Sequence, residues 1–557
     1  MQSRSFWRYR YAGYILFLGL CLAHWPAWGQ ERVFTRQDTL RGSITPERAW
    51  WDLQFYHLTV KVIPESKRFE GHNLIRYKVL HSHQVIQIDL QEPLTLTKVT
   101  QDQKELQYRR DGNAWFITLE KSQEAGHTEE IVVYYEGSPR EAMRPPWEGG
   151  VQWEKDSNDN WFIATSCQGI GASVWWPCKD HMYDEPDSMR ISVNVPAGLK
   201  NVSNGLLIGT EEQSDNTVTF HWKVNNPINN YGVNLNVANY TGWQETFPGE
   251  GGALQVSYYV LPESLTAAKK QFEQVPKLLK AFEHWFGPYP FYEDGFKIVE
   301  VPYLGMEHQS SVTYGNKFSN GYLGRDLSGT GWGLKFDFIL IHESAHEWFA
   351  NNITYRDIAE MWIHESFTSY AEALYLEYYF GKKAASEYVI GVRDIIQNQA
   401  RIMGYFGVNH KGSGDMYPKG SNMLHTIRQI IDDDELWRRI LRGLNEEFYH
   451  STVSGKQVIH YINEMAGQDF TMVFKQYLED IRIPELEYEI KNGTLHYRWN
   501  KVMDDFAMPV KVRLGQEEVV WLHPVANQWK KREITGKTLE ADPNFYIVTK
   551  KRNGLKR

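Results

Sequence analysis

The spacing of apolar residues changes twice along this chain, and that change limits the fold more than any other feature. From about residue 50 to residue 260, apolar and polar residues alternate in short runs between Gly, Asn and Pro, for example over residues 55–62 and 191–195. This period of two is typical of half-buried strands. From Pro262 to about residue 482, apolar residues instead recur every three or four positions, which predicts helices.

The alternation returns after Pro484. Residues 487–490 and 494–499 flank Asn492-Gly493, the preferred dipeptide of a two-residue hairpin turn. We therefore predict a multidomain α+β protein. Its expected parts are an N-terminal antiparallel β domain over residues 30–260, a mainly helical domain over residues 261–483, and a small C-terminal β-sandwich-like domain over residues 484–557.

The first 29 residues predict a secretory signal peptide. Three arginines precede an apolar run over residues 14–23, and small residues close the segment around Gly29. We expect cleavage after Gly29 and a secreted or periplasmic protein. An uncleaved anchor helix is the alternative, but the run is short for a membrane span. A lipid anchor on Cys21 is not expected, because Leu20 stands where a small residue is needed.

Composition excludes several protein classes. Hydrophobic residues make up 42% of the 557 residues, enough for sizeable cores and too many for a disordered chain. The net charge of −9 and the lack of a basic block argue against nucleic-acid partners. After signal cleavage, no apolar stretch is long enough for a stable membrane span. The two remaining cysteines, Cys167 and Cys178, are left either paired or as buried thiols.

Residues 342–346, His-Glu-Ser-Ala-His, carry the strongest chemical signal. Side chains four residues apart share one helix face, so His342 and His346 can reach one metal ion, and Zn²⁺ accepts neutral imidazole. Glu343 is then placed to act as the general base toward a metal-activated water. Taken alone, the motif also fits a helix that merely contains two histidines.

A second expected helix, over residues 362–372, supplies another ligand. Eighteen residues separate His346 from Glu365, which leaves room for a loop and a helical turn. Two histidines and one glutamate leave the fourth zinc position for water. Apolar neighbours of Glu365 argue for its burial, and a buried acid needs a partner. Glu372 is expected either beside a zinc histidine or on the helix surface.

The H-E-x-x-H motif, the spacing of eighteen residues and the segment W-I-H-E-S-F resemble the M1 family of zinc aminopeptidases. These are gluzincins, which include aminopeptidase N and leukotriene A4 hydrolase. The resemblance covers most of residues 50–550 and the predicted domain order. It implies a thermolysin-like catalytic domain over residues 261–483 and one Zn²⁺ per chain. The implied metal ligands are His342, His346 and Glu365, with Glu343 as the catalytic base.

Three further segments extend the resemblance. Residues 304–308, Leu-Gly-Met-Glu-His, resemble the G-x-M-E-N motif, whose acid binds the substrate's free α-amine. Residues 417–420 resemble Y-x-K-G, which implies that Tyr417 hydrogen-bonds the oxyanion and is catalytic. Residues 168–180 resemble Q-x9-C-x-D, which puts Gln168 in the amine pocket. The substrate-binding residues implied by these matches are Glu307, Gln168, Gly305 and Met306.

Four positions depart from the family pattern. Leu304 and His308 replace the first Gly and the last Asn of G-x-M-E-N, and Ser173 stands where an arginine is common. His364 precedes Glu365 where Asn is common. These departures leave the preferred substrate side chain open.

The expected function is a zinc-dependent aminopeptidase that hydrolyses the N-terminal bond of peptides with a free N-terminus. A carboxylate and an amide beside the metal would hold the substrate's ammonium. Residues 296–301 are expected to form the edge strand that pairs with extended substrate. A zinc endopeptidase, which would accept a blocked amine, is one alternative. A non-catalytic peptide- or glycan-binding surface protein that retains the metalloprotease frame is the other.

Overall fold

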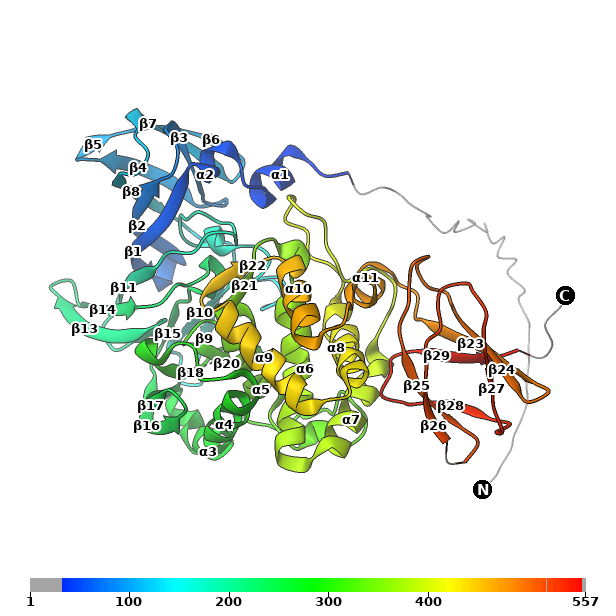
Figure 1. The fold of residues 1–557 in the computed structure, drawn as a ribbon. Helices are drawn as coiled ribbons and strands as arrows, with labels where there is room; N and C mark the ends of the chain where they lie inside the picture. The colour runs from blue at the N-terminus through cyan, green and yellow to red at the C-terminus, as the bar shows by residue number, and fades with distance from the viewer. Residues whose placement is uncertain (1–32, 517, 553–557) are drawn as a thin grey trace, which may run out of the picture. The chain divides into compact units, whose positions relative to one another are not determined.

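The computed structural model describes residues 33–516 and 518–552. The predicted signal peptide lies outside these residues, so its cleavage stays a prediction. None of the helices in the described part is long and apolar enough to cross a membrane. Figure 1 colours the chain in order, with the N-terminal strands in blue and cyan, the helical region in green and yellow, and the C-terminal strands in orange and red.

The N-terminal region consists mainly of strands, as predicted. Its largest sheet has eight strands in the order β13-β14-β11-β1-β2-β8-β4-β5. In this sheet β1 (Trp51–Ile63) pairs antiparallel with β2 (Arg68–Val79) and parallel with β11 (Ser188–Pro196). The β1–β11 pair departs from the predicted antiparallel pairing, because alternation along a strand does not fix the direction of its neighbour.

The other strands of this region complete the large sheet and two smaller ones (Figure 1). The large sheet also contains β4 (Thr95–Gln101), β5 (Lys104–Glu105), β8 (Thr128–Gly137), β13 (Leu206–Gln213) and β14 (Thr217–Val224). A three-stranded sheet contains β3 (His83–Asp89), β7 (Ala114–Gln123) and β6 (Gln107–Asp111). A four-stranded sheet contains β12 (Lys200–Val202), β15 (Asn236–Ala238), β10 (Trp161–Ser166) and β9 (Gly150–Lys155).

The helical region begins with a sheet of its own. Its order is β16-β17-β18-β20-β19. Both β16 (Thr241–Gly249) and β17 (Gly252–Val260) belong to it, so the predicted boundary at residue 260 cuts through this sheet. The sheet instead begins at Thr241. Alternation identified these two strands correctly but could not show which sheet they join.

The same sheet corrects the prediction of the edge strand. β18 (Phe296–Glu300) lies between β17 and β20 (Val312–Tyr314), so its two edges are already paired. The sheet has β16 at one edge and β19 (Gly305–Met306) at the other, and β19 pairs with β20 and has no second neighbour within this sheet. The segment that resembles the amine-binding motif therefore itself forms one edge of the sheet.

The helices of the middle region pack around α6 (Trp362–Phe380), which contacts α4, α5, α7 and α8. Its side chains from Trp362 to Leu376 are all buried. The remaining helices are α3 (Leu265–Gln271), α4 (Val275–Phe286), α5 (Phe338–Ala345), α7 (Lys382–Gly391), α8 (Pro418–Ile431), α9 (Asp434–Glu447), α10 (Gly455–Ala466) and α11 (Thr471–Glu479).

The C-terminal region forms two small sheets, in the orders β27-β24-β23-β29 and β26-β25-β28. The predicted hairpin is present: Asn492 and Gly493 both have positive φ, 52° and 79°, as a tight turn between paired strands requires. The strands are β23 (Glu485–Lys491), β24 (Thr494–Asn500), β25 (Val510–Leu514), β26 (Glu518–Leu522), β27 (Lys530–Glu533), β28 (Leu539–Ala541) and β29 (Val548–Lys551).

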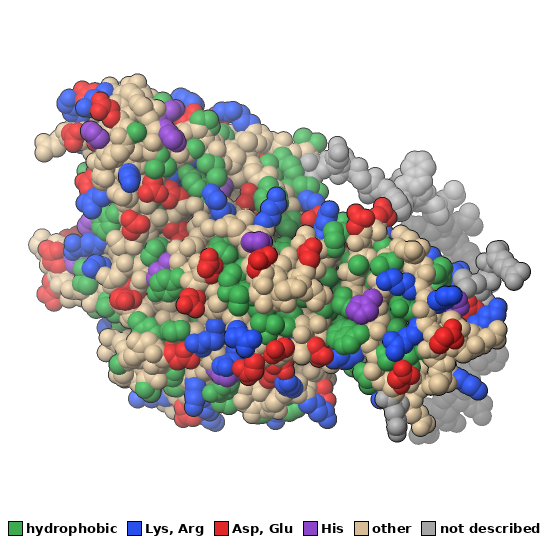
Figure 2. Space-filling model, viewed as in Figure 1, with side chains coloured by type: hydrophobic (Ala, Val, Ile, Leu, Met, Phe, Trp, Pro, Cys, Tyr) green, Lys and Arg blue, Asp and Glu red, His purple; other side chains and the backbone are tan. Residues whose placement is uncertain are grey.

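Cys167 and Cys178 are both buried free thiols. On the face drawn in Figure 2, acidic and basic side chains are interspersed. That no nucleic acid binds stays a prediction.

Candidate active site

The helix α5 presents both histidines on one face. Its N-cap is Asp337, whose carboxylate accepts hydrogen bonds from the backbone N–H groups of Ile339 and Leu340. This N-cap satisfies donors that would otherwise be left unpaired in the core. His346 follows the last helical residue and keeps right-handed helical dihedral angles. The imidazole rings of His342 and His346 therefore lie close together, with centroids 5.0 Å apart.

The helix α6 brings Glu365 to these two rings. Glu365 Oε2 lies 3.5 Å from His342 Nε2 and 3.4 Å from His346 Nε2. All three side chains are buried. Oε2 makes no hydrogen bond within the described part of the chain, which is a costly state for a buried carboxylate oxygen. Two imidazole nitrogens and one carboxylate oxygen converging in this way fit a catalytic zinc site.

The outer nitrogens of the two imidazoles are already occupied. His342 Nδ1 lies 2.8 Å from Glu372 Oε1, and Glu372 also accepts a hydrogen bond from the hydroxyl of Tyr388. His346 Nδ1 lies 2.9 Å from the carbonyl oxygen of Phe349. These partners orient both rings so that Nε2 is left for a metal. Glu372 thus lies beside the histidine rather than on the helix surface.

Two more carboxylates approach the same point. Carboxylate oxygens of Glu307 and Glu343 and a ring nitrogen of His346 all lie within 4.8 Å of one another. The amide nitrogen of Gln168 lies 2.6 Å from Glu307 Oε1 and 3.0 Å from Glu365 Oε1. Buried carboxylates so close together repel one another unless cations accompany them. A divalent metal and one substrate ammonium would supply the matching positive charge.

The environment shifts the ionisation of these groups. Burial raises the pKa of Glu343 to about 7, where a carboxylate can accept and release a proton near neutral pH. Burial also raises the pKa of Glu307. Burial, together with the charges of Glu365 and Glu307, holds the pKa of Tyr417 well above its ordinary value. The Tyr417 phenol is therefore a hydrogen-bond donor at neutral pH.

Gly305 allows the edge strand β19 to lie against α5, the helix that carries His342. A Cβ atom at this position would be 2.5 Å from Ile339 Cγ2 and 2.9 Å from the carbonyl oxygen of Thr313. A larger residue would therefore clash with α5 and with the neighbouring strand β20. Met306 is buried and lines the cavity.

These groups line one cavity of about 580 Å³. The sequence did not indicate Trp147, Tyr322 or Tyr388 as part of its wall. Trp147 comes from a loop of the N-terminal region, and no motif marks it. The predicted site residues that line the cavity are Gln168, Gly305, Met306, Glu307, His342, Glu343, His346, Glu365 and Tyr417.

The departures from the family pattern have different consequences. Leu304 lines the cavity. The buried His308 is not among the cavity-lining residues, and its Nδ1 lies 3.2 Å from Thr313 Oγ1. His364 Nε2 accepts a hydrogen bond from the backbone N–H of Tyr355. These two histidines therefore have structural contacts.

Two models of one peptidase family match the chain. The Peptidase M1 N-terminal domain matches residues 53–231, and the Peptidase family M1 domain matches residues 270–477. Together the two matches span more than half of the chain. The chain belongs to peptidase family M1.

Curated relatives of this M1 chain are distant. A probable aminopeptidase 1 from Sulfurisphaera tokodaii is 20% identical over 61% of this chain and 43% of its own length. A leucyl aminopeptidase from Saccharolobus solfataricus is 20% identical over 58% of this chain and 41% of its own. Endoplasmic reticulum aminopeptidase 1 from Mus musculus is 23% identical over 52% and 32%. The matched segments thus span less than half of these relatives.

Solved structures show the same fold. An M1 zinc metallopeptidase from Deinococcus radiodurans has a TM-score of 0.65 and 19% identity, covering 79% of this chain and 95% of that one. A mutant of an M1 zinc metallopeptidase from the same organism, bound to a Tyr-Ser-Ala substrate, has a TM-score of 0.64 and 19% identity, covering 79% and 96%.

Proposed function

We propose that this M1 protein is a zinc-dependent aminopeptidase that removes the first residue of peptides. One observation carries the proposal: buried Glu307, held by Gln168, lies beside Glu343 and the candidate metal ligand His346. A carboxylate this close to the metal site leaves room for a substrate's ammonium but for little chain beyond it. The scissile bond is then the first peptide bond.

The residues divide the reaction among them. His342, His346 and Glu365 would hold Zn²⁺, which would supply a Lewis acid for the scissile carbonyl and for the attacking water. Glu343 takes the proton of the attacking water and passes it to the leaving amine. The Tyr417 hydroxyl donates a hydrogen bond to the oxyanion that develops at the carbonyl. Glu307 and Gln168 hold the substrate ammonium in line with this bond.

The relatives support the proposal, since they include a leucyl aminopeptidase and since one structural neighbour is bound to a Tyr-Ser-Ala substrate. We also propose that the protein acts outside the cytoplasm, because residues 1–29 have the layout of a secretory signal peptide.

A hydrolysis assay with free and N-acetylated peptides tests the function. We expect hydrolysis of the free peptide, its loss after treatment with a chelator, and its return on adding Zn²⁺. Cleavage of both peptides at similar rates would favour an endopeptidase. Binding without hydrolysis of either would favour the non-catalytic alternative.

Glu307→Ala is expected to reduce turnover of free peptides by about one to two decades. A charge-assisted hydrogen bond to a buried ammonium contributes about 1.5–3 kcal/mol, which corresponds to that loss. Any residual cleavage of acetylated peptide should change much less. Equal losses on both substrates, measured as kcat/KM, would indicate instead that Glu307 has a structural role.

Tyr417→Phe is expected to lower kcat by about two to three decades, the usual effect of removing one oxyanion donor. KM should stay within a few-fold, because the hydrogen bond strengthens only as charge develops. The ring and its packing remain, so zinc content and melting temperature should be unchanged. A kcat near that of the wild type would move the oxyanion role to another group.

A further inference from the structure

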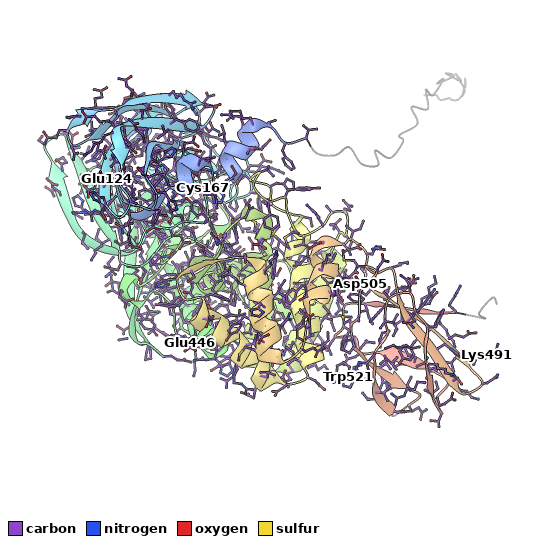
Figure 3. The ribbon with its side chains drawn as sticks, turned by 45° about the horizontal axis from the view of Figure 1, so that its top comes forward. Glu124, Cys167, Glu446, Lys491, Asp505 and Trp521 are labelled. Carbon is purple, nitrogen blue, oxygen red and sulfur yellow. The ribbon has the colours of Figure 1, made fainter. Side chains whose placement is uncertain are left out.

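The short turn that carries Gln168 is held by a helix outside both family matches. This turn, residues 167–171, begins at Cys167, which Figure 3 labels. It closes with a hydrogen bond from the Gly171 N–H to the Cys167 carbonyl oxygen, at 2.8 Å. We call it the Gln168 turn. The helix is α1 (Arg36–Gly42), which precedes residue 53, where the first family match begins.

Arg41 of α1 places its guanidinium directly against the Gln168 turn. Its Nη1 donates to the carbonyl oxygen of Asp180 at 2.6 Å and lies 2.8 Å from Asp180 Oδ2. Its Nη2 is so close to Gly171 that a Cβ atom there would be 1.8 Å away. The guanidinium thus rests on the turn's backbone, and only 17% of the Arg41 side chain is exposed.

A closed set of polar contacts fixes Arg41 in this place. The Asp180 N–H donates to Asp89 Oδ2 at 3.0 Å. Asp89 pairs with the fully buried Arg48 at 2.6 Å. Arg48 in turn donates to the carbonyl oxygen of Leu40, next to Arg41, at 2.9 Å. Because these contacts form one ring that returns to α1, the arrangement has little freedom to shift.

Other contacts hold the far side of the turn. Gln91 donates to the Ile170 carbonyl oxygen at 2.6 Å, and Asn409 Nδ2 donates to that of Gly169 at 3.2 Å. The backbone of Asn409 is packed against α1, since a Cβ atom on Gly42 would be 1.9 Å from the Asn409 backbone nitrogen. The helix therefore contacts the turn through Arg41 and supports a second contact through Gly42.

We propose that Arg41 is a positioning residue of the active site, which acts through Gln168 on the binding of the substrate's amine. This inference rests on the proposed aminopeptidase function. Arg41 neutralises Asp180 and fixes the backbone of the Gln168 turn. The Gln168 amide is thereby aimed at Glu307 and Glu365, the two acids it contacts. Without Arg41, a buried carboxylate is left without its cation and the amide loses its fixed direction.

A double-mutant cycle tests this role. Arg41→Ala should raise KM for a free-amine peptide by roughly tenfold, with kcat within a few-fold, and so should Gln168→Ala. The double variant should be no worse than Gln168→Ala, because Arg41 then has nothing left to position. Arg36→Ala is the matched control: Arg36 lies on the same helix, is 68% exposed and pairs with Asp111 on the surface, so its KM should not change.

Losses that multiply in the double variant would overturn the proposal, because Arg41 would then act independently of Gln168. Zinc content and melting temperature are measured on each preparation. If Arg41→Ala does not fold, the same cycle is run with Arg41→Gln, and an unchanged KM there overturns the proposal too. The proposed aminopeptidase function is tested separately by the chelator-sensitive hydrolysis of the wild-type protein. That result does not depend on the outcome of the double-mutant cycle.

Discussion

Replacing Glu343 with glutamine is expected to abolish nearly all turnover while the protein keeps its zinc. The amide has almost the same shape as the carboxylate but cannot take a proton from water. General base catalysis contributes about two to four decades, so kcat should fall by that amount. The metal ligands His342, His346 and Glu365 are untouched, and metal content should stay at one Zn²⁺ per chain.

The measurement is kcat together with metal analysis on one preparation. Glu273→Gln, a change of the same chemistry at an exposed position, is the matched control and should behave as the wild type. Normal turnover in Glu343→Gln would show that Glu343 is not the general base. Loss of zinc in that variant would show that Glu343 is a ligand instead.

Removing a metal ligand should lower the zinc content as well as the turnover, unlike the loss of the base. His342→Ala or Glu365→Ala takes one of three protein ligands from the site, so bound zinc and hydrolysis should be lost together. Substituting a residue that merely contacts a metal ligand lowers metal affinity by about 10- to 100-fold. Removing a ligand itself should lower the zinc affinity further. Titration with Zn²⁺ at fixed pH measures it.

His460→Ala is the control for this pair of variants, because His460 is exposed on α10. It should bind zinc as the wild type does. A His342→Ala protein that retained stoichiometric zinc and full activity would contradict the assignment of the site to α5 and α6.

Much of this site follows from local sequence rules. Four-residue spacing places His342 and His346 on one helix face wherever that helix lies, and the loop length to Glu365 allows the second helix to return. The grouping of His342, His346 and Glu365 and the hairpin at Asn492-Gly493 could be predicted for this reason.

Other features depend on contacts between distant segments, which periodicity does not show. β16 and β17 alternate like the strands before them, yet they pair with each other and join the sheet of the next region, where β17 pairs with β18. Trp147 reaches the cavity from a loop with no motif. Arg41 and Asp180 are 139 residues apart in the sequence, and no local sequence pattern predicts their contact.

The most direct test of the central claim is to identify the first products that zinc-loaded wild-type protein releases from a peptide of mixed sequence. Mass spectrometry at early times should find only the N-terminal amino acid and the peptide shortened by one residue. The N-acetylated form of the same peptide should remain intact. Internal fragments, or equal cleavage of the acetylated peptide, would contradict the role of Glu307 and Gln168 as an amine anchor and with it the assignment as an aminopeptidase.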